Sequence, residues 1–140
     1  MRKIDLIVIH CSATRCDRNY PVEQLRADHR MRGFKDVGYH YYIRRDGTLH
    51  SCRPLEEIGA HARGWNAQSV GICYEGGLDP TGHPADTRTE EQRVVMQEVV
   101  TSLLKRFPES RVVGHRDLPG CGGKECPCFE VQDVIVVQKM

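Results

Sequence analysis

Two histidines and one cysteine in this sequence have side chains that could share a metal ion. His10 ends an apolar run, His115 follows the apolar segment 111–114, and Cys126 stands before Pro127. Ligands of α/β proteins gather where strands end, so the two imidazoles are expected to be neighbours. Pro127 disfavours the helical conformation at Cys126, which places the thiol on a loop. Two imidazoles and a thiolate would bind zinc and leave a fourth position open for water, as catalytic sites do.

The same part of the sequence permits a different zinc site. Cys121, Cys126 and Cys128 together with His115 could form a closed site that only stabilises the fold. A histidine at the end of a strand is also more often a structural residue than a metal ligand. The three candidate ligands are far apart in sequence, so their spacing alone does not decide between the two zinc sites.

Composition and charge narrow the class of protein. The 140 residues, 39% hydrophobic and 28% charged, predict one globular domain over residues 1–140. Lys and Arg number 20 against 19 Asp and Glu, which gives no electrostatic reason to expect a nucleic acid partner. The odd count of 7 cysteines favours reduced thiols over a disulfide framework. The first apolar run is short and interrupted by Asp5, so we expect synthesis in the cytoplasm without a signal peptide and without membrane insertion.

The first half of the chain contains strand and helix patterns. Residues 4–10 are an apolar, β-branched run that is typical of a strand covered on both faces. Residues 21–32 fit a surface helix that Gly33 ends. Asp46-Gly47 indicates a hairpin turn. The remaining predictions for this half are strands at 39–44, 48–53 and 70–75 and an exposed loop at 78–88.

The second half contains the clearest helix of the sequence. Thr89 and Gln92 have the spacing of a capping box, and apolar residues then keep to i, i+3, i+4 spacing up to Pro108. Residues 111–114 return as a strand. This order predicts an α/β fold, a single domain with a central mixed sheet of about five strands flanked by two to three helices. The segment 126–140 fits a short helix or a strand, and both remain open.

Short segments between residues 4 and 130 combine into a specific pattern. They are HCSAT at 10–14, DVGYHY at 36–41, RDGT at 45–48, GAHARGWN at 59–66, SVGIC at 69–73, GHRD at 114–117 and KECP at 124–127. In sequence and in order they resemble the N-acetylmuramoyl-L-alanine amidase family of amidase-type phage lysozymes and peptidoglycan recognition proteins. Two features depart from the short phage enzymes: Cys128, where those enzymes commonly have serine, and the tail beyond Glu130.

The resemblance implies roles for individual residues. The family's zinc ligands correspond to His10, His115 and Cys126, with one zinc ion per chain. The active-site tyrosine corresponds to Tyr39 and the active-site lysine to Lys124. A third position, His61, matches a residue that lines the substrate groove. Two neighbours could also contact glycan or stem peptide, although a lone tryptophan can equally belong to the core; they are Trp65 and Asn66.

Hydrolysis of an amide requires an activated carbonyl and an activated water, and zinc can supply both near neutral pH. Lys124 lies two residues before Cys126 and is expected to stabilise the oxyanion of the tetrahedral intermediate. Tyr39, with an ordinary pKa near 10, fits orientation of the water or proton transfer to the leaving amine better than general base catalysis. The alternatives are a tyrosine that only anchors the hairpin and a lysine that is a solvated loop cation.

Predictions for neighbouring side chains follow from local pattern. Alternation along the strand predicts that Tyr39 shares a face with Tyr41 and Ile43, opposite His40. Three further histidines have polar neighbours in sequence and are expected to face solvent: His29, His50 and His83.

Three functions remain for the chain. The first is zinc-dependent hydrolysis of the bond between N-acetylmuramic acid and L-alanine by a monomeric endolysin of a phage or prophage, which reaches the cell wall after release. The second is a peptidoglycan-binding module without catalysis, and the retained Cys126 and Lys124 argue against it. The third is a cysteine-rich structural zinc domain that binds another protein.

Overall fold

A five-stranded mixed sheet forms the centre of the computed structural model, which describes residues 1–120 and 125–135. The strand order is β4-β3-β5-β1-β7. β1 pairs in parallel with β5 and β7, β3 pairs in parallel with β5, and β4 runs antiparallel to β3 at one edge. The bounds are β1 Leu6–Cys11, β3 Tyr41–Ile43, β4 Leu49–Ser51, β5 Ser69–Tyr74 and β7 Arg111–Gly114.

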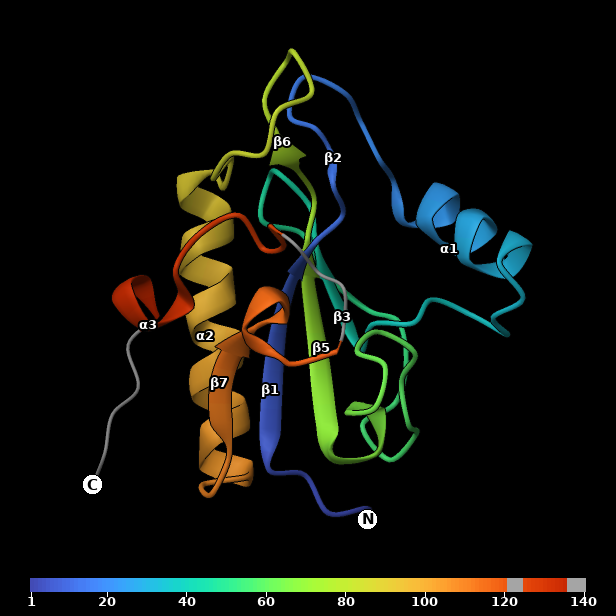
Figure 1. Cartoon of the computed structure of the whole chain (residues 1–140), viewed down its shortest axis with the longest axis vertical. Coiled ribbons are helices and arrows are strands. Elements are labelled where there is room, and N and C mark those ends of the chain that lie inside the picture. Colours follow the sequence, from blue (N-terminus) through green and yellow to red (C-terminus); the bar gives the residue numbers. More distant parts are fainter. Residues whose placement is uncertain (121–124, 136–140) are drawn as a thin grey trace.

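The helices and a second, two-stranded sheet surround the central sheet. α2 runs alongside the central strands, whereas α1 lies at the opposite side of the molecule (Figure 1). β2 and β6 pair in parallel beyond the carboxyl ends of β1 and β5. The bounds are α1 Val22–Met31, α2 Glu90–Arg106, α3 Val131–Val134, β2 Thr14–Arg15, β6 Gly77–Leu78 and the 3-10 turns η1 Asn66–Gln68 and η2 His115–Asp117.

The start and the end of α2 follow from its sequence. The Thr89 hydroxyl accepts the N–H of Gln92 at 3.1 Å, and the Gln92 side chain accepts the N–H of Thr89 at 2.9 Å. This capping box provides acceptors for N–H groups that lack a partner within the helix. The helix ends at Arg106, just before Pro108, which has no N–H to continue it. The predicted helix and its cap are confirmed.

Strand alternation gives the sheet two faces with different contents. Ile7 and Ile9 of β1 pack with Met96 of α2 in the main apolar cluster, and we call this side the helix face. Val8 and His10 alternate with them and point to the other side, which we call the histidine face. Other strand residues of the helix face are Ile43, Val70, Ile72, Tyr74 and Val112.

The structure confirms the predicted α/β fold with its mixed five-stranded sheet, with small changes in element bounds. Both hairpin strands around Gly47 are shorter than predicted, and β3 begins only at Tyr41 because the residues before it form a bend. Within the predicted loop 78–88, Leu78 belongs to β6 and bridges Pro84. The open segment after residue 126 contains the single helical turn α3, and residues 136–140 lie outside the described residues. No helix in the described ranges is long and apolar enough to cross a membrane.

Candidate active site

The two histidines of the predicted metal site follow adjacent parallel strands. Ile9 of β1 is in register with Gly114 of β7, so the next residues along the two chains, His10 and His115, stand side by side. Their ring centroids are 4.5 Å apart. The sheet therefore brings together two ligands that are distant in sequence, as the strand-end argument predicted.

The loop that carries Cys126 is fastened to the end of the sheet. The backbone N–H of Cys11 donates to the Cys126 Sγ at 3.2 Å, and the N–H of Arg116 donates to the Cys126 carbonyl at 2.8 Å. The Tyr74 hydroxyl donates to the Pro127 carbonyl at 2.6 Å. These bonds hold the thiol beside the end of β1, because each joins the loop to a strand end or to η2.

His10, His115 and Cys126 form a group whose ligand atoms all lie within 4.8 Å of one another. In a tetrahedral zinc site with bonds of about 2.0 Å to nitrogen and 2.3 Å to sulfur, the ligand atoms are roughly 3.3 to 3.7 Å apart. A small closing movement around the ion would reach that spacing. Two imidazoles and a thiolate are also the ligand chemistry that zinc accepts and that magnesium and calcium do not. The residues present therefore fit a zinc ion.

The surroundings favour the protonation states that bind metal. His10 is 1% exposed. Burial lowers its pKa well below the ordinary value, and the neighbouring His61 and His115 act in the same direction. Burial likewise lowers the pKa of His115. Both imidazoles are therefore neutral near pH 7 and can each offer a lone pair.

Tyr39 reaches the same place, but its predicted orientation is wrong. Its ring lies 4.9 Å from that of His10, centroid to centroid. It packs in the buried cluster of Tyr42 rather than with Tyr41 and Ile43, which belong to the helix face. The physical reason is that Tyr39 lies in the bend before β3, where strand alternation does not apply. Burial raises the pKa of Tyr39 well above its ordinary value, so the phenol keeps its proton and acts as a donor.

His29 is a neighbour of the site that the sequence interpretation placed in solvent, and that placement is wrong. It is buried in α1, its ring centroid lies 5.5 Å from that of Tyr39, and its Nδ1 accepts the N–H of Gly38 at 2.8 Å. A signal for this existed, because Val22, Leu25 and His29 follow helical spacing and share one face of α1. Counting the histidine with the apolar positions would have placed it inside.

The three predicted substrate contacts lie close to the histidine face in different roles. His61 bonds to His10, its Nδ1 lying 2.8 Å from the His10 Nε2. The Asn66 side chain accepts the backbone N–H groups of His61 and Ala62, each at 2.9 Å. Trp65 is partly buried against a small apolar cluster that includes Ala62, and its Nε1 donates to the Pro119 carbonyl at 3.2 Å. Their contact with substrate stays a prediction.

Two further predicted residues, Lys124 and Cys121, lie outside the described residues. Cys128 is described, and its Sγ lies 3.9 Å from the Cys11 Sγ. Within the ranges 1–120 and 125–135, the group that could hold a metal includes Cys126 and not Cys128. This placement favours the open three-ligand site over the closed site with several cysteines.

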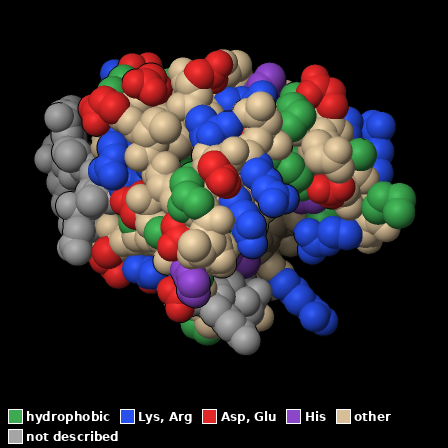
Figure 2. Space-filling view, turned by 90° about the horizontal axis from the view of Figure 1, so that it is seen from above, with side chains coloured by type: hydrophobic (Ala, Val, Ile, Leu, Met, Phe, Trp, Pro, Cys, Tyr) green, Lys and Arg blue, Asp and Glu red, His purple; other side chains and the backbone are tan. Residues whose placement is uncertain are grey.

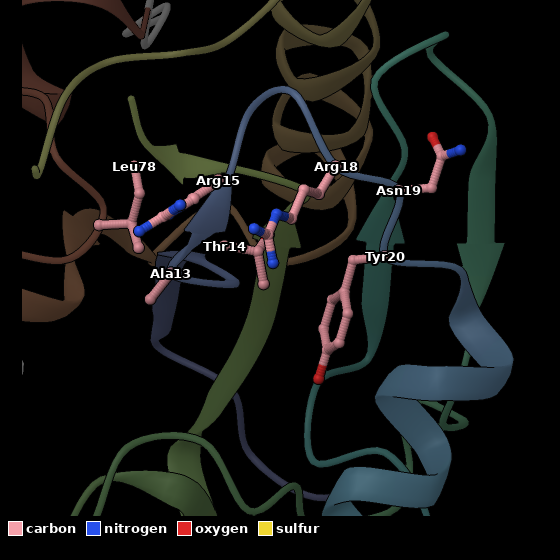
Figure 3. Close-up of a pocket in the computed structure, with 7 residues that line it drawn as sticks. All are labelled: Ala13, Thr14, Arg15, Arg18, Asn19, Tyr20 and Leu78. Atoms are coloured by element: carbon pink, nitrogen blue, oxygen red, sulfur yellow. The ribbon is translucent and has the colours of Figure 1, made fainter. Parts of the chain in front are cut away.

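A basic hollow lies just beyond the candidate metal site. Lys and Arg side chains gather around a depression on the face seen in Figure 2, where histidine is also visible. One hollow of about 260 Å³ is lined by residues 13–15, 18–20 and Leu78. Arg18 extends toward Thr14 and Arg15 extends toward Leu78 (Figure 3). Neither arginine forms an ion pair within the described part of the chain.

Comparison with known proteins places this geometry in a family. A family model for N-acetylmuramoyl-L-alanine amidase matches residues 1–129. The endolysin of Enterobacteria phage K11 is 37% identical over 124 residues, which cover 89% of this chain and 80% of the relative. A peptidoglycan-recognition protein of Drosophila melanogaster is 32% identical over 120 residues, which cover 82% of this chain and 65% of the relative.

A solved structure agrees with these sequence matches. The N-acetylmuramoyl-L-alanine amidase LysC from Clostridium intestinale URNW superposes with a TM-score of 0.80 at 28% identity, covering 95% of this chain and 83% of that one. The range matched by the family model includes all three candidate metal ligands. The chain therefore belongs to the N-acetylmuramoyl-L-alanine amidase family.

Proposed function

We propose that this chain is a phage or prophage endolysin that uses zinc to hydrolyse the amide bond between N-acetylmuramic acid and L-alanine in peptidoglycan. The observation that carries the proposal is the grouping of His10, His115 and Cys126 at the strand ends of an amidase-family fold. Three protein ligands leave a coordination position for the reaction, which a closed structural site would not. The names of the endolysin relatives support action on the cell wall.

The protein groups around the ligands would each do a separate task. Zinc, when bound, supplies Lewis-acid polarisation of the scissile carbonyl and a nucleophile at neutral pH. Tyr39 is partly buried, and desolvation raises the pKa of its phenol, which therefore keeps its proton. Its ring stands against that of His10, so we assign it to donating a hydrogen bond to the reacting groups or a proton to the leaving amine. Lys124 is assigned to the oxyanion from the sequence pattern alone, and this assignment stays a prediction.

The basic hollow suits the acidic part of the substrate. Ala13 follows His10 by three residues, so the lining begins within about 11 Å of a metal ligand, the reach of three extended residues. Stem peptides of peptidoglycan carry free carboxylates, and Arg15 and Arg18 offer guanidinium groups that carboxylates bind well. We assign these two arginines to holding a carboxylate of the stem peptide while the amide bond is cut.

Product analysis tests the proposed activity. Zinc-loaded protein is incubated with purified peptidoglycan, and new amino termini and new reducing sugar ends are counted separately. Amide hydrolysis releases L-alanine amino termini and leaves the glycan strands uncut. New reducing ends without L-alanine amino termini, or no product at all, would contradict the proposal.

The competing function is a peptidoglycan-binding module without catalysis. The two functions differ in what they require of Cys126, which a binding module does not need as a ligand. We expect Cys126→Ala to sediment with cell walls as the wild type does and to release no L-alanine amino termini. If the wild type also bound walls and released none, the binding module would be the better description.

A further inference from the structure

His61 is joined to a metal-ligand residue on one side and to the sheet on the other. Its Nδ1 lies 2.8 Å from the His10 Nε2, and the two rings meet edge to face with centroids 4.9 Å apart. Its Nε2 lies 3.2 Å from the Ser69 hydroxyl oxygen, on the first residue of β5. Both ring nitrogens of His61 are therefore engaged inside the protein.

The fold makes room for this imidazole and fixes it. A Cβ on Gly71 would lie 2.6 Å from the His61 Cγ, and a Cβ on Gly59 would lie 2.8 Å from its Cδ2, so glycine at both positions allows the ring to lie where it does. The Asn66 side chain accepts the backbone N–H of His61 at 2.9 Å and holds the loop. The ring thus has a defined place on the histidine face over β5.

Proton positions along Ser69, His61 and His10 follow from the requirement that His10 bind metal. The His10 Nε2 is taken by His61, which leaves Nδ1 as the nitrogen that can offer a lone pair to zinc. A neutral His10 that ligates through Nδ1 carries its proton on Nε2 and donates it to the His61 Nδ1. His61 then carries its own proton on Nε2 and donates it to Ser69. The reverse direction would place a proton on the His10 nitrogen that has to bind zinc.

We propose that His61 is a positioning residue for the metal site, which accepts the Nε2–H of His10 and so fixes the nitrogen and ring orientation with which His10 binds zinc. This rests on the proposed function insofar as zinc is the ion. Ser69 extends the arrangement by accepting the other His61 proton. Partners of this kind commonly change metal affinity or activity by 10- to 100-fold when they are removed.

Nitrogen NMR of the zinc-loaded, histidine-labelled wild type tests the proposal directly. We expect the His10 resonances to show a metal-bound Nδ1 and a protonated Nε2, and His61 to be neutral with its proton on Nε2. Zinc bound through the His10 Nε2 would overturn this inference and leave the proposed function standing. A wild type that binds no zinc would overturn both.

Zinc affinity of matched variants provides a second test that does not use activity. His61→Leu removes the acceptor and is expected to weaken zinc binding by about 10- to 100-fold, whereas His61→Asn places a carbonyl oxygen where Nδ1 was and should recover most of the loss. His40→Leu is the control for loss of a neighbouring buried imidazole, because the hydrogen bonds of His40 go to Arg2, Glu57 and Gly71 and its ring only packs edge to face on that of His61, with centroids 5.9 Å apart. Equal affinity in His61→Leu and the wild type would contradict the proposal, as would an equal loss in His40→Leu.

Discussion

The helix face and the histidine face of this sheet are built from the same strands and contain different side chains. On the helix face, apolar residues meet α2, and Met96 and Val100 are fully buried. On the histidine face, the His10 ring meets those of Tyr39, His61 and His115 at centroid distances of 4.5 to 4.9 Å. Alternation along each strand separates the two sets by one residue.

The helix face mainly stabilises the fold, whereas the histidine face holds the groups that could do chemistry. Apolar burial on the helix face is the main stabilising contribution to such a fold. Buried polar rings on the histidine face cost stability unless they are hydrogen-bonded, and here they are bonded to one another and to the backbone. Substitutions on the two faces should therefore affect different measurements.

The largest expected effect is on the histidine face. His10→Ala removes a buried ligand, so zinc content should fall from about one ion per chain to near zero, and amidase activity should fall by more than the roughly 100-fold that loss of an orienting partner costs. Metal analysis and product release measure the two effects. If the variant kept its zinc content and its amidase activity, His10 would not be a ligand, and the histidine face would not be the face that carries the chemistry.

On the helix face, Met96→Ala should reduce stability and leave zinc binding almost unchanged. Met96 is fully buried in the main apolar cluster, and its truncation should lower the free energy of unfolding by about 2 to 5 kcal/mol in urea denaturation. At a temperature where the variant is folded, zinc affinity should stay within about twofold of the wild type. A parallel loss of zinc affinity would show that the two faces are not independent.

Low pH should reduce the free energy of unfolding of the protein through His29, whose ring packs against that of Tyr39. Burial, assisted by the charge of Arg32, lowers the pKa of His29 to about 4 in the folded protein, against about 6.5 when unfolded. The unfolded chain therefore takes up a proton first as the pH falls. The contribution of His29 is complete above pH 6.5 and is lost between about pH 6.5 and 4, by roughly 2 to 3 kcal/mol.

Urea denaturation of metal-free protein at pH 7 and pH 4.5 measures this loss. His29→Asn keeps an acceptor for the Gly38 N–H but cannot titrate, so its free energy of unfolding should decline less over that interval than that of the wild type. Equal declines in the two proteins would show that His29 is not the group responsible.

The smallest expected effect lies in the basic hollow beyond both faces. Arg18→Gln removes one exposed charge from the lining, so KM for peptidoglycan fragments with free carboxylates should rise by about two- to fivefold while kcat stays unchanged. Raised salt should reduce the difference between variant and wild type. If KM at low salt did not change, the hollow would not take part in substrate binding.

The sequence predicted most of the sheet and part of the site for identifiable reasons. His10 and His115 could be joined because parallel strands end at a common edge, a rule that needs no coordinates. Spacing could not distinguish Cys126 from Cys128 as the ligand, because the two cysteines flank Pro127 in the same loop. The family pattern selected Cys126, and the hydrogen bond from the Cys11 N–H shows what holds it in place.

The remaining errors concern side chains outside regular elements or on a mixed face. Tyr39 was given a strand orientation, and the chain bends before β3 begins. His29 was assigned to solvent by its polar neighbours, although its helical position is internal. The bond between His61 and His10 depends on how the loop before β5 folds over Gly71, which is a tertiary contact that no local pattern contains.

The most direct test compares the zinc content of two variants, each with one cysteine of the same loop replaced. Cys126→Ser and Cys128→Ser are purified under the same conditions, and zinc per chain and release of L-alanine amino termini are measured for each. The catalytic three-ligand site predicts loss of zinc and activity in Cys126→Ser, with both retained in Cys128→Ser. Loss of zinc in Cys128→Ser, or full zinc content in Cys126→Ser, would contradict the site described for this chain.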